Sequence, residues 1–92
     1  MNIRTWSTRC WVDGHANVHN VAWRSKEDAI EQSKIAMAGT PFVAAREVVR
    51  LEVVGTETFS SGEVREYVSD RWNGNDSGTF DHTIQDGTEI IR

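Results

Sequence analysis

Cys10, His15 and His19 are the first residues whose types and spacing could bind a metal ion. Structural zinc sites use four ligands and usually include two or more cysteines. This chain has one cysteine and would need Asp13 or His82 to complete the set. A catalytic Cys–His pair requires a partly exposed, electropositive thiolate near a base, whereas Cys10 falls within a predicted strand. We therefore interpret it as a structural cysteine and expect no metal, no cofactor and no enzymatic activity.

Residues 73–78 (Asn-Gly-Asn-Asp-Ser-Gly) look like the opening of a calcium-binding loop, with oxygen-bearing side chains at alternate positions and a glycine at the sixth. The twelfth position of such a loop is a glutamate that binds the ion with both oxygens, and here it is Ile84. The flanking segments also have the character of strands rather than helices. We interpret the segment as a turn built from residues that favour turns.

One segment, residues 25–38, carries the start and stop signals of a helix. Ser25 and Asp28 form an S-x-x-D capping box, which satisfies backbone N–H groups at a helix start. Gly39, followed by Thr40-Pro41, ends the helix. Small and apolar residues fall on one face, which we expect to lie close against a sheet: Ala29, Ile30, Ser33, Ala36 and Met37.

The opposite face of this helix holds three carboxylates, Glu27, Asp28 and Glu31, with the apolar Ile35 near them. The helix dipole favours acidic residues in a first turn whatever the function, and single exposed apolar residues are common. The face could therefore be plain solvated surface. It could equally bind a partner, with Ile35 as an apolar anchor among carboxylates that match lysines or arginines opposite. On that interpretation, charge reversal of the three carboxylates abolishes binding without unfolding the domain.

The remaining segments show the composition and alternation of strands. Strands are expected at residues 3–12, 18–23, 43–54 and 63–72, joined in part by turns at Asp13-Gly14 and Asn73-Gly74, with a last hairpin of 79–84 and 88–91 around Asp86-Gly87. The early part of 43–54 could instead continue the helix, and residues 75–92 could be loosely ordered. The predicted fold class is α+β, with a single helix on a mostly antiparallel sheet in the order β-β-α-β-β and the C-terminal hairpin at its end.

Period-two alternation assigns the strand side chains to faces. In the first strand, Trp6, Cys10 and Val12 share one face, and Trp11 falls on the other. In the third strand, the residues expected to face the helix are Ala45, Val49, Leu51 and Val53. In the fourth strand, Val64, Val68 and Trp72 are expected on one face, opposite Arg65, Tyr67 and Arg71.

Composition limits the classes of function. A chain of 92 residues is long enough for one domain with a modest core, expected over residues 1–92. No apolar run approaches the roughly 20 residues that cross a bilayer, so we expect a cytoplasmic protein. A net charge of −4 argues against a general nucleic-acid-binding protein. One alternative is a patch of arginines and tryptophans near the N-terminus that stacks on single-stranded bases: Arg4, Arg9 and Arg24 with Trp6 and Trp11.

A short acidic chain with an early strand, a capped Ser-Lys-Glu-Asp-Ala helix and strands at 43–54 and 63–72 resembles the small anti-CRISPR proteins of phages and mobile elements. It is similar in particular to inhibitors of type I surveillance complexes, some of which pack one helix on an antiparallel sheet. The likeness covers residues 18–72 and rests on size, charge and element order. It implies no functional residue by alignment, and it leaves the N-terminal hairpin and the acidic tail unexplained.

That resemblance implies a phage-encoded, non-enzymatic inhibitor acting in the host bacterial cytoplasm. Such a protein would occupy a basic Cas surface that grips guide RNA or target DNA, and so block target recognition. The carboxylates Glu27, Asp28 and Glu31 would match that surface, with Ile35 as a desolvated contact. We expect no direct binding to free nucleic acid and none to membranes. Two rivals stay open: a small nucleic-acid-binding accessory protein, and a phage structural or assembly protein that self-associates through an uncovered strand edge.

Overall fold

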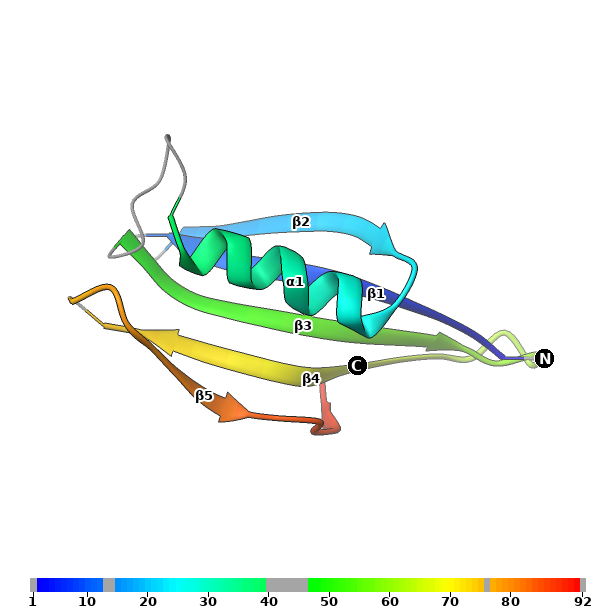
Figure 1. Ribbon diagram of the computed structural model, residues 1–92. Coiled ribbons are helices and arrows are strands. Elements are labelled where there is room, and N and C mark those ends of the chain that lie inside the picture. The colour runs from blue at the N-terminus through cyan, green and yellow to red at the C-terminus, as the bar shows by residue number, and fades with distance from the viewer. Residues whose placement is uncertain (1, 13–14, 40–46, 76, 92) are drawn as a thin grey trace.

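In the described part of the chain, one helix lies across one face of an antiparallel sheet (Figure 1). The computed structural model describes residues 2–12, 15–39, 47–75 and 77–91, and within residues 15–21 the backbone alone. In this part of the chain the elements are β1 Ile3–Val12, β2 His15–Trp23, α1 Lys26–Met37, β3 Val48–Thr58, β4 Val64–Gly74, β5 Phe80–Ile84 and β6 Glu89–Ile90. The predicted α+β fold class, one helix on a mostly antiparallel sheet, is confirmed.

The sheet has the strand order β2-β1-β3-β4-β5, and β6 pairs with the same edge of β4 as β5. Every pairing between these strands is antiparallel. Helix α1 therefore carries the chain from the edge strand β2 over β1 to the central strand β3 (Figure 1). The helix contacts β1, β2 and β3, which leaves the opposite face of the sheet without a helix among the described residues.

Helix α1 begins and ends where its sequence signals place it. The Ser25 hydroxyl accepts a hydrogen bond from the Asp28 backbone N–H at 3.2 Å, and Gly39 adopts the left-handed conformation at φ 88° that favours glycine after a helix end. The predicted inner face is also confirmed. Ala29 and Ser33 are fully buried, and the flanking inner residues Ile30, Ala36 and Met37 pack against the core.

The core lies between α1 and the facing side of β1, β3 and β4. Its buried centre consists of Ala29, Val48, Leu51, Val53 and Trp72. Partly buried side chains surround this centre, and they include Trp6, Cys10, Val12, Trp23 and Phe80. The small residues on the inner helix face allow α1 to lie close to the sheet, so a single helix can bury the aromatic side chains of a short chain.

Two irregularities in the strand pairing change the faces predicted for β3 and β4. Val12 pairs with Val48 and Trp11 with Arg50, which leaves Val49 as an extra residue. Val48 is therefore buried and Val49 is 47% exposed, so the prediction that Val49 faces the helix was wrong. Period-two alternation fails here because a bulge inserts one unpaired residue into a strand. Leu51 and Val53 face the helix as predicted.

The second irregularity lies in β4, where Val53 pairs with Asp70 and Val54 with Val68, so Ser69 has no partner in the register. Trp72 consequently belongs to the helix side, whereas Val68 packs on the opposite side and is 1% exposed. The prediction that these two residues share a face was wrong. For the same reason Tyr67 lies on the helix side, in edge-to-face contact with the Trp6 ring.

The C-terminal segments form strands close to the predicted positions, but the predicted hairpin between them was wrong. Both β5 and β6 are antiparallel to β4, so they run in the same direction along one edge and cannot pair with each other. The chain bends between them opposite the β4 bulge, where the Gly87 N–H donates to the Ser69 carbonyl at 2.8 Å. The bulge, rather than a tight turn, therefore determines the path of this edge.

Several sequence predictions lie outside the described residues. They are the Asp13-Gly14 turn, the Thr40-Pro41 stop, the burial of Ala45, and the choice between helix and strand for residues 43–46. Among the described residues, no helix combines the length and apolar character needed to cross a bilayer.

Candidate functional site

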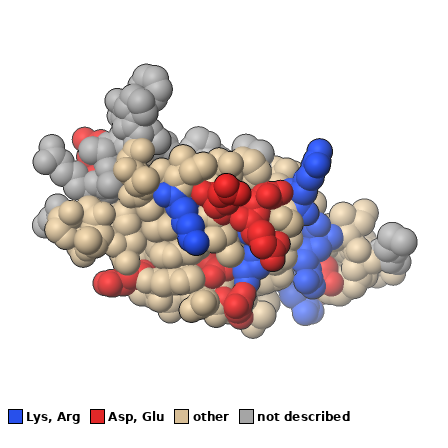
Figure 2. Space-filling model, in the orientation of Figure 1, with Lys and Arg blue, Asp and Glu red and all other residues tan. Residues whose placement is uncertain are grey.

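The outer face of α1 is an acidic, solvent-exposed surface. Glu27, Asp28 and Glu31 are all exposed, and Ile35 follows one helical turn after Glu31 with 53% of its surface exposed. Figure 2 shows acidic side chains gathered over α1, beside a basic side chain. Lys34 is the basic residue in the last turn of the helix. The predicted residues thus share one accessible surface, which we call the acidic helix face.

The three carboxylates differ from most carboxylates of the sheet, because they have no cationic partner among the described residues. Within the described ranges, Glu27, Asp28 and Glu31 form no ion pair. Most sheet and edge carboxylates are paired: Glu52 and Glu89 with Arg71, Glu57 with Arg4, Glu66 with Arg9, Asp70 with Lys26 and His82, and Asp86 with Lys26. The charge of the acidic helix face is therefore directed to solvent rather than compensated inside the fold.

An ionic cluster around the buried carboxylate of Asp70 fixes the helix on the sheet beside this face. Lys26, the first residue of α1, extends its ammonium group to 3.5 Å from Asp70 on β4 and also bonds to Asp86. Burial alone would lower the pKa of Lys26, but the hydrogen bond that Lys26 donates to Asp86 and the charges of Asp70 and Asp86 together outweigh burial and raise this pKa. The same bond lowers the pKa of Asp86. Both groups are thus held in their charged forms.

Asp70 is the centre of this cluster and is 1% exposed. Its Oδ2 accepts from the Ser69 hydroxyl at 2.5 Å, and its Oδ1 lies 2.9 Å from His82 Nε2. The His82 ring stacks on Trp72 with centroids 4.4 Å apart. The carboxylate separates the hydroxyl from the imidazole, so the three groups form no nucleophile–base pair. We interpret the cluster as a structural device that connects α1, β4 and β5.

The face of the sheet away from α1 is closed by ion pairs instead of a second layer. Arg9 on β1 reaches Glu66 on β4 at 3.5 Å, across the intervening strand β3 and over Val54. Arg71 joins Glu52 at 2.6 Å to Glu89 at 2.8 Å. Burial would lower the pKa of Arg71, but the bonds to Glu52 and Glu89 and the charges of these carboxylates together outweigh burial and raise this pKa. The stems of such long side chains can cover apolar groups, and Val54, which lies between Arg9 and Glu66 in the register, is 1% exposed.

The basic and aromatic residues near the N-terminus do not form one patch. Alternation along β1 places Arg4 and Trp6 on the helix side, and Arg9 and Trp11 on the other. Trp6 packs against the core, and Arg50 covers the Trp11 ring with its guanidinium 4.1 Å from the ring centroid. The structure therefore does not bring together the continuous arginine–tryptophan surface that single-stranded nucleic acid would need.

The surroundings of Cys10 fit a structural role rather than a reactive one. Cys10 packs against the core, and burial raises the pKa of its thiol, which disfavours the reactive thiolate. The side chains of His15 and His19 lie outside the described part.

In the turn after β4, the Asn75 side-chain oxygen accepts hydrogen bonds from the backbone N–H and the hydroxyl of Ser77 at 3.0 and 2.6 Å. This oxygen is therefore engaged by the turn itself. No group of three or more His, Cys, Asp or Glu among the described residues could hold a metal ion.

Comparison of the chain with protein-family models, with curated proteins and with solved structures gives no match. The acidic helix face is thus defined by its own geometry and charge. Sequence analysis identified its residues from helical periodicity, but it missed the ionic cluster beside it. The only signal for that cluster was a lysine at the first helical position, because its partners lie far along the chain on strands whose register was unknown.

Proposed function

We propose that the protein is a non-enzymatic inhibitor that binds a basic surface of another protein through its acidic helix face. The observation that carries this proposal is the contrast in pairing: most described carboxylates of the sheet form ion pairs, whereas Glu27, Asp28 and Glu31 gather on one helix face, are exposed and have no ion-pair partner among the described residues. Ile35 adds an exposed apolar side chain to this surface. Apolar anchors surrounded by complementary charges are typical of protein-binding sites.

The partner that fits this chemistry is a protein surface rich in lysine and arginine. Machines that bind nucleic acid depend on such surfaces, because their affinity comes largely from contacts with phosphates. The resemblance to small anti-CRISPR proteins supports a type I Cas surveillance complex in the host bacterial cytoplasm as this partner. The acidic helix face would occupy the surface that receives target DNA and so block its recognition, a mechanism that requires no catalytic residue.

The first experiment is a pull-down with the tagged protein from a nuclease-treated bacterial lysate that contains a type I surveillance complex. The proposal expects Cas subunits in fixed stoichiometry with the bait, and prior loading of the complex with target DNA should reduce their recovery. Recovery of nucleic acid only when nuclease is omitted would instead favour the nucleic-acid-binding alternative. Recovery of neither Cas subunits nor nucleic acid would argue against both.

Self-association is a second candidate, favoured by the outer edge of β2. This strand pairs with β1 alone among the described strands, and its nine residues include no Lys, Arg, Asp, Glu or Pro. Exposed strand edges normally carry such residues because they prevent edge-to-edge pairing. Light scattering after gel filtration at several concentrations tests this candidate. If the chain self-associates, we expect a mass that rises with concentration. Asn20→Lys, which adds a charge to the strand, should return the chain to the monomer mass.

A further inference from the structure

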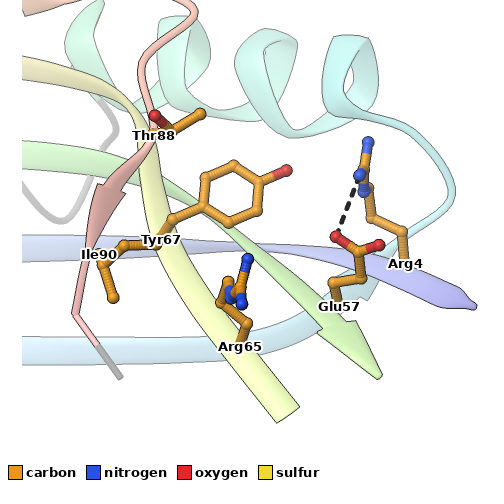
Figure 3. A pocket seen from close by; sticks show the side chains of 6 residues that line it. All are labelled: Arg4, Glu57, Arg65, Tyr67, Thr88 and Ile90. Carbon is orange, nitrogen blue, oxygen red and sulfur yellow. Dashed lines mark hydrogen bonds and ion pairs between the residues drawn. The ribbon is translucent and has the colours of Figure 1, made fainter. Parts of the chain in front are cut away.

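A hollow lies on the helix side of the sheet, beyond the N-terminal end of α1 (Figure 3). It has a volume of about 470 Å³ and is partly open to solvent. Strands β1, β3 and β4 form its floor, and the segment leading into β6 forms one wall (Figure 3). The six lining residues are Arg4, Glu57, Arg65, Tyr67, Thr88 and Ile90.

The lining is rich in hydrogen-bond donors, and its one carboxylate is already engaged. Glu57 Oε2 accepts from Arg4 at 3.2 Å and Glu57 Oε1 accepts from Asn2 at 3.1 Å. Arg4 and Arg65 flank Glu57 on the neighbouring strands, which places their backbones about 10 Å apart. Two arginines and one carboxylate give the hollow a net positive charge, in a chain whose overall charge is −4.

Two of the donors have no acceptor within the described part of the chain. Arg65 forms no ion pair there, and its guanidinium lies 5.4 Å from the Phe59 ring centroid. The Tyr67 hydroxyl forms no hydrogen bond there, and it points into the hollow toward Arg4 and Glu57 (Figure 3). A ligand that supplies acceptors could therefore satisfy both groups at once.

The phenol ring is held in this position by the backbone beneath it. A Cβ atom on Gly55 would lie 2.6 Å from Tyr67 Cζ and 2.7 Å from its hydroxyl oxygen, so only glycine leaves room for the ring. Trp6, which also lies over Gly55, packs edge-to-face against the phenol ring, with centroids 6.1 Å apart. The hydroxyl is thus positioned before any ligand arrives, which lowers the cost of ordering the site.

We propose that this hollow binds the carboxylate of an organic acid that carries an apolar body. Arg65 and Arg4 would donate charge-assisted hydrogen bonds to the carboxylate, and the Tyr67 hydroxyl would donate a third. Ile90, which is 58% exposed, and the phenol ring would contact the apolar part. The proposal is independent of the acidic helix face. A free small acid and an acidic side chain of a protein partner offer the same chemistry, and the test separates these sources.

The test titrates ¹⁵N-labelled protein with phenylacetate and, in parallel, with neutral phenylacetamide, which has the same shape. The proposal expects saturable shifts of the Arg65 and Tyr67 amides with phenylacetate and at least tenfold weaker binding of the amide. Arg65→Gln should weaken phenylacetate binding at least fivefold. Tyr67→Phe, which keeps the ring, should weaken it about threefold. Arg24→Gln, at an exposed arginine outside the hollow, should change it less than twofold.

Equal binding of acid and amide would overturn the proposal, as would equal effects of the Arg65 and Arg24 variants. An undiminished affinity in a folded Arg65→Gln protein would do the same. A short peptide with aspartate beside phenylalanine, compared with its asparagine counterpart, identifies the source. Tighter binding of the aspartate peptide than of phenylacetate would assign the hollow to a protein side chain. Binding of phenylacetate alone would assign it to a free acid.

Discussion

Replacement of Asp70 by alanine is expected to be among the most damaging single changes in the protein. This carboxylate is 1% exposed and accepts from the Ser69 hydroxyl at 2.5 Å, with His82 Nε2 at 2.9 Å. It also attracts the Lys26 ammonium group at 3.5 Å. In the variant, the buried Ser69 hydroxyl would lose its acceptor. The Lys26 ammonium group and the His82 ring would lose the carboxylate that they now face. It would also release the first turn of α1 from β4.

The expected loss in the free energy of unfolding depends on how deeply the groups that contact Asp70 are buried. Removal of one member of a buried ion pair costs about 3–5 kcal/mol. The side chains of His82 and Lys26 are 31% and 19% exposed and can turn to water, so the lower end of that range, about 3 kcal/mol, applies. For 92 residues the unfolding entropy is roughly 0.19 kcal/mol per kelvin, which converts this loss into a fall in Tm of about 15 °C.

Urea unfolding followed by tryptophan fluorescence measures this loss, because Trp72 is buried and stacks on His82. The midpoint should fall with little change in slope. Asp81→Ala is the matched control, since Asp81 is an exposed carboxylate of β5 with no ion pair among the described residues; it should change stability by less than about 0.5 kcal/mol. A loss below about 1 kcal/mol for Asp70→Ala would refute the role of the cluster.

Three further predictions test the bulge at Val49, the close packing of Tyr67 over Gly55, and the ion pair between Lys26 and Asp86. Val48→Ala should destabilise the fold by about 2 kcal/mol and Val49→Ala by less than about 0.5 kcal/mol; equal losses in urea unfolding would contradict the observed register. Gly55→Ala, which places a methyl group 2.6 Å from the phenol ring above it, should cost about 2 kcal/mol and change the near-ultraviolet circular dichroism; an unaltered spectrum would be the contrary result. Because the bond to Lys26 lowers the pKa of Asp86 below its ordinary 3.8, its stabilisation is present above that pH and lost as the pH falls further. The stability difference between wild type and Asp86→Asn should therefore shrink below about pH 4, and a gap that widens in acid would oppose this explanation.

Local sequence signals predicted the helix and the strands because these elements depend on neighbouring residues. The capping serine at Ser25 and the glycine at Gly39 define the ends of α1 through bonds and dihedral angles within a few residues. Helical periodicity likewise identified Ala29 and Ser33 as buried, and Glu27 and Ile35 as exposed. No distant contact is needed for either inference.

The errors came from features that depend on partner strands. The bulge at Val49 changes which residue of β3 is buried, and the bulge at Ser69 moves Trp72 to the face opposite Val68. An alternating sequence gives no sign of an unpaired residue. The ionic cluster and the hollow could not be predicted for the same reason, because Asp70 reaches Lys26, 44 positions earlier, only once the register is set.

The central claim is that the acidic helix face binds a basic protein partner, and matched charge reversals test it most directly. Glu27→Lys/Glu31→Lys and the control Glu63→Lys/Asp81→Lys change the net charge equally, and all four positions are exposed. Affinity for the purified type I surveillance complex is measured by biolayer interferometry after thermal melts confirm folding. The proposal predicts about 30-fold weaker binding for the helix variant, or about 2 kcal/mol, and less than threefold for the control. Equal losses, or full affinity in a folded helix variant, would contradict it.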